Sequence, residues 1–218
     1  MMRYIYILIL LLTTTVSYAE DLYQVTMLRA APGSLSALLD ETKQLRSSLD
    51  DDLVIMRHSQ GDHWDLLLMG LAPKEATLQP KLNTPLAFQH SFLSESSTSW
   101  AKFKKAADKN GLYHIEMFHA AADQYTALVK QRNMENAYYH GTGRAGNMIF
   151  TTVFGNDMDV FTVGFYPDMK AFATDPDLSD ETYAKAATDA GFESRSSIGL
   201  YLRQFLSSHF DTLATKVR

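Results

Sequence analysis

Two pairs of acid–base side chains stand at alternating positions in the second half of the chain. His114 is two residues from Glu116, and His209 is two residues from Asp211. An imidazole and a carboxylate that share a cavity can act as a general acid–base pair, because burial raises the pKa of the carboxyl and a neighbouring charge can offset that shift. These side chains also suit a hard or borderline metal ion. The sequence leaves a structural alternative open, since residues 209–211 equally fit a helix end followed by the start of a strand.

Strands are the elements that must position these groups. Residues 113–118 and 23–28 alternate in the manner of strands, with side chains pointing to opposite faces. One face of each strand is apolar and consists of Tyr113, Ile115, Met117, Tyr23, Val25 and Met27. The opposite faces consist of His114, Glu116, Phe118, Gln24, Thr26 and Leu28. We expect the apolar faces to take helices, which leaves the polar residues around a cavity between two sheets. A sheet whose polar face meets water is the alternative.

The two strands belong to an internal repeat. Residues 22–39 align with residues 112–129 at an offset of 90, with seven identities in eighteen positions. Residues 61–66 align with residues 155–160 at an offset of 94, and Asp65 and Asp159 recur there, where a turn-stabilising role is expected. The repeat predicts two modules, each β-α-β-β-α-β. Residues 20–103 form the first module, residues 104–111 a charged linker, and residues 112–218 the second module.

The second copy resembles NIPSNAP-type and stress-responsive domains of the dimeric α/β-barrel superfamily. The matching stretches are Tyr113 to Phe118, Arg132 to Tyr138, Asn147 to Phe150 and Gly155 to Tyr166. The resemblance implies an α+β fold in which two ferredoxin-like modules pack sheet to sheet into one barrel. Its strand order, 4-1-3-2, places the last strand beside the first, so His209 and Asp211 would approach Glu116 and Phe118. Members include cofactor-free oxygenases, haem enzymes and proteins with no known chemistry, so the fold does not fix the function.

A predicted helix after residue 123 carries two further polar residues within its apolar stripe. Arg132 and Asn136 are four residues apart there, and buried polar groups require partners. The favoured role of both residues is structural, as polar contacts that hold the helix to the sheet or one module to the other. Ligand contact is the alternative, for which the candidates are Gln24, Thr26, Phe118, Arg132 and Asn136.

The first residues have the pattern of a secretory signal peptide. Arg3 precedes an apolar run from Tyr4 to Leu12, and Ser17 and Ala19 stand at the −3 and −1 positions of a cleavage site. The run is shorter than the ~20 residues of a membrane span. We therefore expect residues 1–19 to be removed, no membrane span afterwards, and a periplasmic or extracellular product.

Composition excludes several classes of function. The chain of 218 residues contains no cysteine, which removes disulfides, thiolate nucleophiles and cysteine-ligated metals. Its formal charge is −5, which disfavours general nucleic-acid binding.

Three hypotheses follow for the function. The first is a secreted, small-molecule-binding barrel that holds a largely apolar ligand between its modules, with His114, Glu116, His209 and Asp211 as catalytic candidates for a cofactor-independent reaction. The second is a non-catalytic interaction or structural module, whose insertion at residues 175–192 contacts a partner. The third is a haem-binding barrel. No cofactor follows from the sequence, and oligomerisation is not required to close the barrel.

Overall fold

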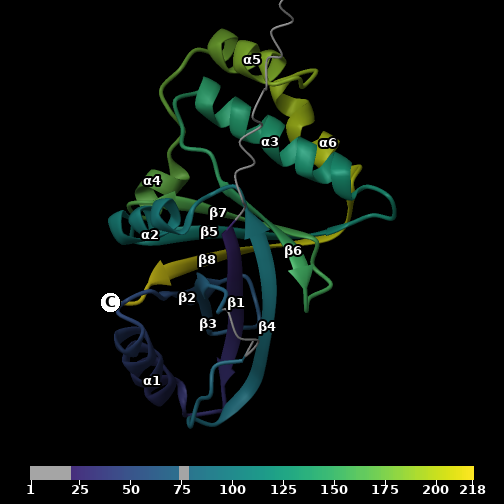
Figure 1. Ribbon diagram of the computed structural model, residues 1–218. Helices are drawn as coiled ribbons and strands as arrows, with labels where there is room; N and C mark the ends of the chain where they lie inside the picture. The colour runs from purple at the N-terminus through teal and green to yellow at the C-terminus, as the bar shows by residue number, and fades with distance from the viewer. Residues whose placement is uncertain (1–20, 74–78) are drawn as a thin grey trace, which may run out of the picture.

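The computed structural model describes residues 21–73 and 79–218, so the predicted signal peptide lies outside the described residues. The strands are β1 (Asp21–Ala30), β2 (Val54–Gln60), β3 (Leu66–Leu71), β4 (Leu86–Ser96), β5 (Leu112–Ala120), β6 (Met148–Phe154), β7 (Val160–Tyr166) and β8 (Leu206–Lys216). The helices are α1 (Leu35–Ser48), α2 (Trp100–Lys109), α3 (Tyr125–Gly141), α4 (Met169–Ala173), α5 (Asp180–Asp189), the 3₁₀ turn η1 (Arg195–Ser197) and α6 (Ile198–Arg203). Figure 1 shows α1 on one side of the strands and α3, α5 and α6 on another.

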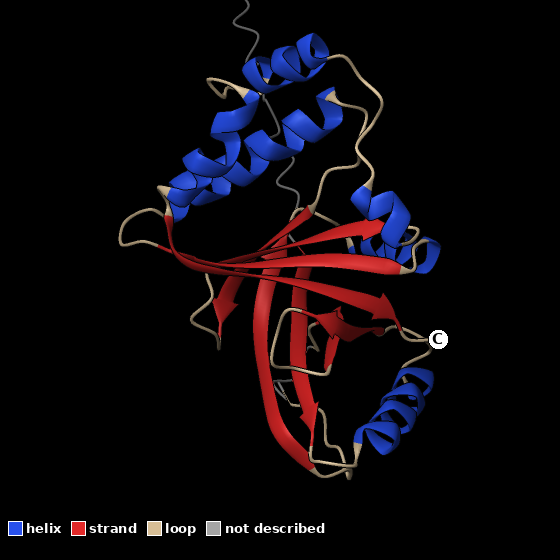
Figure 2. Ribbon diagram, turned by 180° about the vertical axis from the view of Figure 1, so that it is seen from behind, coloured by secondary structure: helices blue, strands red, loops and turns tan. Residues whose placement is uncertain are grey.

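The eight strands form one closed antiparallel barrel in the order β1-β3-β2-β8-β5-β7-β6-β4. Each half of the chain contributes a sheet, β4-β1-β3-β2 from the first and β8-β5-β7-β6 from the second. The predicted 4-1-3-2 order is therefore confirmed in both halves. The sheets join edge to edge where β2 pairs with β8 and β4 pairs with β6, so both sheets lose their free edges. Figure 2 shows the strands of the two sheets together, with the helices outside them.

The barrel interior is apolar and filled with side chains. Its buried cluster includes Tyr23, Val25, Met27, Tyr113, Ile115, Met117, Phe92, Phe150 and Phe161. The Phe150 and Phe161 rings stack with centroids 4.7 Å apart, and Phe161 meets Phe92 edge to face. The expectation that the apolar faces take the helices is wrong. The fully apolar face turns inward because an interior closed by eight strands offers polar groups neither water nor partners.

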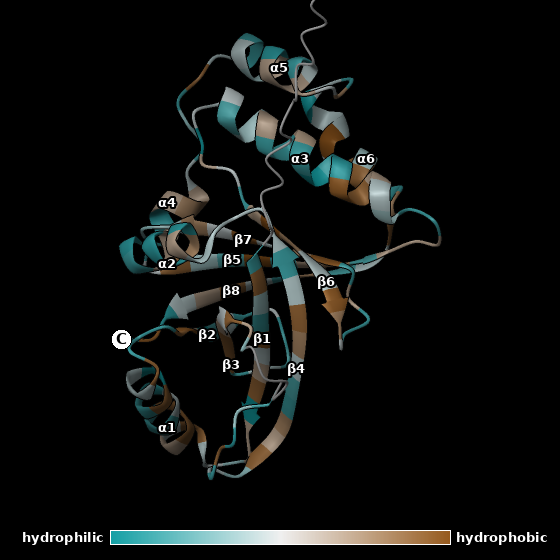
Figure 3. Ribbon diagram, in the orientation of Figure 1, coloured by the Kyte–Doolittle hydropathy of each residue, from teal (hydrophilic) through white to brown (hydrophobic). Residues whose placement is uncertain are grey.

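Helices cover the outer faces of the two sheets. Helix α1 contributes Leu38 to a cluster with Leu28, Ile55 and Leu68 on the first sheet. Helix α3 contributes Leu128 to a cluster with Phe118 and Val160 on the second sheet. The β-strand side chains on these outer faces are mixed in character, and hydrophilic and hydrophobic residues alternate in bands along β4 (Figure 3). The polar residues singled out in β1 and β5 thus lie between sheet and helix, outside the barrel.

Helix α2 replaces most of the predicted linker and closes one end of the barrel. Residues 104–109 are helical, and Trp100, Phe103 and Ala107 belong to the interior cluster. These three positions recur at i, i+3 and i+7, which places them on one helix face. The Tyr113 hydroxyl donates to the Ala107 carbonyl at 2.9 Å, and burial raises the pKa of the Tyr113 phenol above its ordinary range. Helix α2 therefore fills this end of the barrel with apolar side chains and does not act as a linker.

The remaining elements differ from expectation in two places. Between β3 and β4, the described residues 72–73 and 79–85 contain no helix, so in this part of the first half the predicted β-α-β-β-α-β order is not seen. Strand β8 begins at Leu206, so His209 and Asp211 lie within a strand and not at a helix end. In the second half, the insertion at residues 175–192 forms α5, whose Tyr183 and Ala187 pack with Tyr138 of α3.

Candidate functional site

The predicted site residue Glu116 lies in the layer between β5 and α3. Its carboxylate accepts hydrogen bonds from Thr162 Oγ1 at 2.9 Å and from Asn147 Nδ2 at 3.1 Å. Arg132 Nη1 lies 3.5 Å from the same Oε2 atom. Thr162 and Arg132 are 1% and 2% exposed, so these contacts are shielded from water. The Glu116 carboxylate is thus held by three side chains on the outer side of the barrel wall, and it does not face the interior as the sequence suggested.

Arg132 of α3 is the centre of this network. Its second guanidinium nitrogen pairs with Glu135, its Nε donates to Gln131 at 2.7 Å, and its Cζ lies 4.7 Å from the Phe118 ring centroid. Tyr139 donates from its hydroxyl to Glu135 at 2.6 Å, and burial raises the pKa of the Tyr139 phenol above its ordinary range, with the Glu135 charge adding to that shift. One buried cation between two carboxylates is a satisfied structural arrangement.

The structure brings part of the predicted set together. Glu116 pairs in register with Asp211, and Phe118 with His209, as the strand order implied. The His209 ring stacks on Phe118 with centroids 6.1 Å apart, and His209 Nε2 lies 3.7 Å from Asp211. These side chains share the outer face of the sheet, and the Asp211 side chain is 54% exposed. The expected convergence into an enclosed cavity is wrong because the whole face points outward.

His114, Asn136, Gln24 and Thr26 lie in three separate places. The His114 ring lies 5.2 Å from that of Phe172 in α4. Asn136 donates from Nδ2 to the Asn147 carbonyl at 2.8 Å and accepts from the Asn147 N–H at 2.7 Å, which ties α3 to the chain before β6. Asn136 also borders a groove of about 330 Å³ between α3 and β6.

Gln24 and Thr26 are on the outer face of the first sheet. They border a hollow of about 440 Å³ whose other walls include Leu45, Leu49 and Leu71. The Thr26 hydroxyl lies 2.8 Å from that of Ser91, so it is held against β4. This hollow belongs to the first half alone and is distant in the chain from Glu116.

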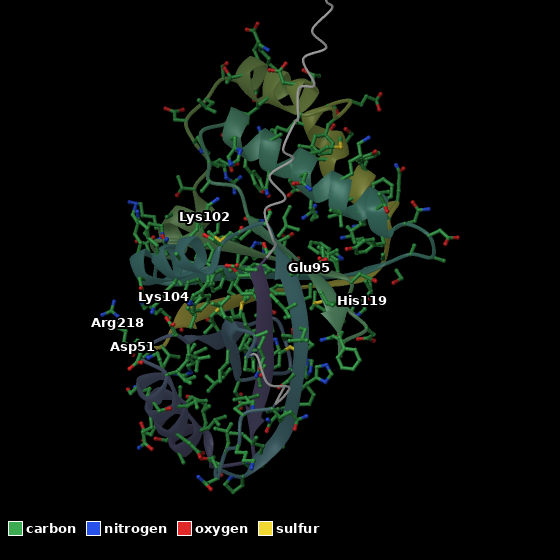
Figure 4. All side chains as sticks on the ribbon, viewed as in Figure 1. Asp51, Glu95, Lys102, Lys104, His119 and Arg218 are labelled. Carbon is green, nitrogen blue, oxygen red and sulfur yellow. The ribbon has the colours of Figure 1, made fainter. Side chains whose placement is uncertain are left out.

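A cavity built by both halves lies at the end of the barrel that α2 does not close. We call it the mouth, with a volume of about 310 Å³ and a lining of Met27, Asp62, His63, Phe88, His90, Met117, His119, Asn156, Asp157, Met158 and Phe210. Figure 4 places His119 at this end of the barrel and Lys104 at the other. Met27 and Met117 stand at corresponding positions of β1 and β5, and the hairpin turns after β2 and β6 supply the rim.

The mouth combines an apolar floor with aromatic and imidazole walls. The Phe88 and His90 rings are nearly parallel, with centroids 6.2 Å apart, and the His119 ring meets Phe210 edge to face at 6.1 Å. His63 Nδ1 lies 2.5 Å from Asp62, whose other oxygen accepts from Trp64 Nε1 at 2.9 Å. Flat rings over thioethers suit a small, largely apolar ligand, and imidazoles can bind its polar groups.

Sequence reasoning missed this cavity because it assigned the opposite strand faces to the interior. The strand residues that face the barrel interior are every second residue of β1 and β5. The same alternation from which Glu116 was wrongly assigned to the interior would therefore have placed Met27, Met117 and His119 there, had the opposite face been chosen. His63 and His90 have no distinguishing local pattern and reach the mouth only through barrel closure. Within residues 21–73 and 79–218, no group of three or more His, Cys, Asp or Glu side chains could hold a metal ion.

Comparison with known proteins identifies the fold. No protein-family model matches the chain, and no curated protein matches it. An anthrone oxidase-like protein of known structure superposes with a TM-score of 0.58 at 9% identity, over 91% of this chain and 92% of that chain. A protein of Fusobacterium nucleatum subsp. nucleatum, assigned as a monooxygenase, gives a TM-score of 0.52 at 8% identity, over 92% of this chain and 94% of that chain.

A heme-binding protein from Thermus thermophilus is also similar, with a TM-score of 0.48, 13% identity, and coverage of 91% of this chain and 92% of that chain. The anthrone oxidase-like protein and the Fusobacterium protein have ferredoxin-like α+β barrel folds, and the present chain has the same class of fold. At such low identity the likeness concerns architecture alone. The tandem duplication and the NIPSNAP-like character of the second half stay predictions.

Proposed function

We propose that this protein is a secreted small-molecule-binding barrel whose ligand, small and largely apolar, enters the mouth between the two halves. The observation that carries the proposal is the cavity of about 310 Å³ lined from both halves by methionine and aromatic side chains. A volume near 300 Å³ is at the lower end of the usual range for ligand pockets, which fits a compact molecule. Secretion is proposed from the leader sequence, and none of the described helices combines the length and apolar character of a membrane span.

The neighbours named for oxidase and monooxygenase chemistry support small-molecule binding as a use of this fold. For this chain, acid–base chemistry at the mouth would fall to His90 or His119, since Glu116 is committed to Arg132 and Thr162. His114, His209 and Asp211 lie outside the mouth, so the proposal does not use them. A cofactor-independent reaction is thus an extension of the binding proposal.

The filled barrel interior favours one alternative, a non-catalytic interaction module. Val25, Ile115, Phe92 and Phe161 are fully buried, so the interior itself has no room for a ligand. In that alternative, the mouth is a shallow surface feature and binds nothing. A haem-binding barrel is the third hypothesis, and a Soret absorption band in the purified protein would favour it over both others.

Native mass spectrometry of the chain purified from its own host tests the proposal. We expect a co-purified molecule that is lost in Met117→Phe, where the larger ring fills the mouth. The matched control is Leu71→Phe, because Leu71 borders the outer hollow and is 47% exposed. If the molecule is lost in Leu71→Phe and retained in Met117→Phe, the binding site is the outer hollow, and the proposal that the ligand binds in the mouth is wrong. A chain with no bound molecule in any preparation would favour the interaction module.

A further inference from the structure

A methionine and a histidine lie side by side on the inner wall of the mouth. Met27 of β1 is paired in register with His90 of β4, and both line the cavity. Directly opposed residues of an antiparallel pair have Cβ atoms about 4.5–5.5 Å apart and point to the same face. A thioether sulfur and an imidazole nitrogen at this separation can reach one ion between them.

Two further thioethers approach the same space from the second half. Met117 reaches the mouth from β5 and Met158 from the turn before β7, and they are 6% and 3% exposed. Because the chain contains no cysteine, methionine supplies its soft donors. Soft thioether ligands select Cu(I), and imidazole is also a good copper ligand. Zinc is disfavoured, since the described residues contain no cluster of three His, Cys, Asp or Glu side chains.

The contacts of the three imidazoles single out His90. His63 is engaged with Asp62 at 2.5 Å, and His119 lies 3.0 Å from the Ser208 hydroxyl and 3.6 Å from Asp157. Within the described residues, the His90 side chain has no hydrogen-bond or ion-pair partner, and its ring packs near those of Phe88 and Phe92, at 6.2 Å and 6.0 Å between centroids. Its ring nitrogens are therefore available for a ligand in the mouth.

We propose that the mouth binds one Cu(I) ion through the Met27 sulfur, a His90 ring nitrogen and the Met117 sulfur. Low exposure of both methionines would protect the ion from water, while the open cavity provides its entry path. The inference does not depend on the organic ligand proposed above, although both use the same cavity. Binding here requires only a neutral imidazole and involves no change of oxidation state.

Anaerobic titration with Cu(I), in competition with the chromogenic chelator bicinchoninate, tests the site. We expect one Cu(I) per chain, with affinity reduced about tenfold or more in each of Met27→Leu, Met117→Leu and His90→Phe, because each removes one ligand of a soft-metal site. Leucine keeps nearly the same apolar volume as methionine, so folding should be retained, as thermal unfolding can verify. The matched control, Met148→Leu on β6, should bind as the parent does.

X-ray absorption on the loaded protein supplies a second readout, in which sulfur neighbours of copper are expected and should diminish in Met27→Leu. A parent chain that fails to withdraw Cu(I) from the chelator would overturn the proposal. So would unchanged affinity in both Met→Leu variants. Failure of the organic-ligand proposal is separable, because Met→Leu preserves the apolar wall that such a ligand contacts.

Discussion

The Glu116 carboxylate and the Arg132 guanidinium face each other across the layer between the barrel and α3, with Nη1 and Oε2 3.5 Å apart. Arg132 pairs at the same time with Glu135, and all three side chains are largely buried. Two carboxylates with little access to water therefore share a single cation. This relationship explains why residues of catalytic type occur here, since they fix α3 on the second sheet.

Arg132→Met should destabilise the fold strongly. It leaves Glu116 and Glu135 without their shared cation, and uncompensated buried charge costs about 3 kcal/mol or more. Glu116→Gln should cost less, about 1–2 kcal/mol, because the amide still accepts from Thr162 or Asn147. Urea unfolding near neutral pH measures both values. Equal and small losses of unfolding free energy in the two variants would mean that the network contributes little to stability. Reduced binding of the co-purified molecule in Glu116→Gln would instead support a binding role for Glu116.

The resemblance to the barrel superfamily predicted the strand order correctly, whereas the assignment of strand faces was wrong. In β5, Tyr113, Ile115 and Met117 alternate with His114 and Glu116, which correctly indicates a strand with two unlike faces. A barrel covered by helices buries both faces, so alternation alone does not say which face is inside. The deciding factor is polar satisfaction, since α3 brings Arg132 to Glu116 and the closed interior brings no partner.

Ile115→Ala and His114→Ala test this assignment on adjacent residues of β5. Ile115 is fully buried inside the barrel, so its truncation should cost about 2–5 kcal/mol through lost burial and the cavity that remains. His114 is half-buried against Phe172, and its truncation should cost about 1 kcal/mol or less. Chemical denaturation compares the two. A larger loss for His114→Ala would contradict the observed orientation of β5.

Helix α2 and the mouth were missed for a related reason. The run from Lys104 to Lys109 is charged because most of α2 faces water, and only Trp100, Phe103 and Ala107 enter the barrel end. The mouth depends on contacts between residues far apart in the chain, such as Met27 with His90 and the two hairpin turns. No local pattern in either half specifies that meeting.

A titrating carboxylate on α1 predicts a pH-dependent contribution to stability. Glu41 accepts from the Asn83 and Thr84 backbone N–H groups at 2.6 Å and 2.8 Å. These hydrogen bonds, that from Asn83 first, lower the pKa of Glu41 from 4.5 to about 2. Because the folded pKa is the lower one, the stabilisation is present above about pH 4.5 and is lost as the pH falls toward about 2.

Glu41→Gln should therefore lower the free energy of unfolding by about 1 kcal/mol near pH 7, a value reduced for partial exposure of the site. The difference from the parent chain should shrink as the pH approaches about 2, where the Glu41 carboxyl becomes protonated in both states. Urea unfolding at a series of pH values measures this difference. A gap that stays constant down to the lowest pH would show that the charge of Glu41 is not responsible.

Asp65 and Asp159 occupy matching places beside bulges in the first and fifth strands. The pairing of β1 with β4 shifts register between Arg29 and Ala30, and the pairing of β5 with β8 shifts between His119 and Ala120. A bulge leaves a backbone N–H without its ladder partner. Asp65 accepts from the Ala30 N–H at 2.8 Å, and Asp159 accepts from the Ala120 N–H at 2.7 Å. Each carboxylate thus satisfies the donor that its bulge releases.

Asp65→Ala and Asp159→Ala should each cost about 1–3 kcal/mol, because each leaves a part-buried N–H unsatisfied. Asp→Asn at either position should cost less than about 1 kcal/mol, since the amide oxygen accepts the same hydrogen bond without the charge. Thermal unfolding of the four variants separates the two effects, and amide hydrogen exchange at Ala30 and Ala120 reports the bond directly. Exchange at Ala120 should accelerate in Asp159→Ala and stay slow in Asp159→Asn. Equal destabilisation by the Ala and Asn variants would mean that the charge, and not the hydrogen bond, is responsible. Destabilisation at only one of the two positions would contradict the inference that Asp65 and Asp159 play the same role in the two halves.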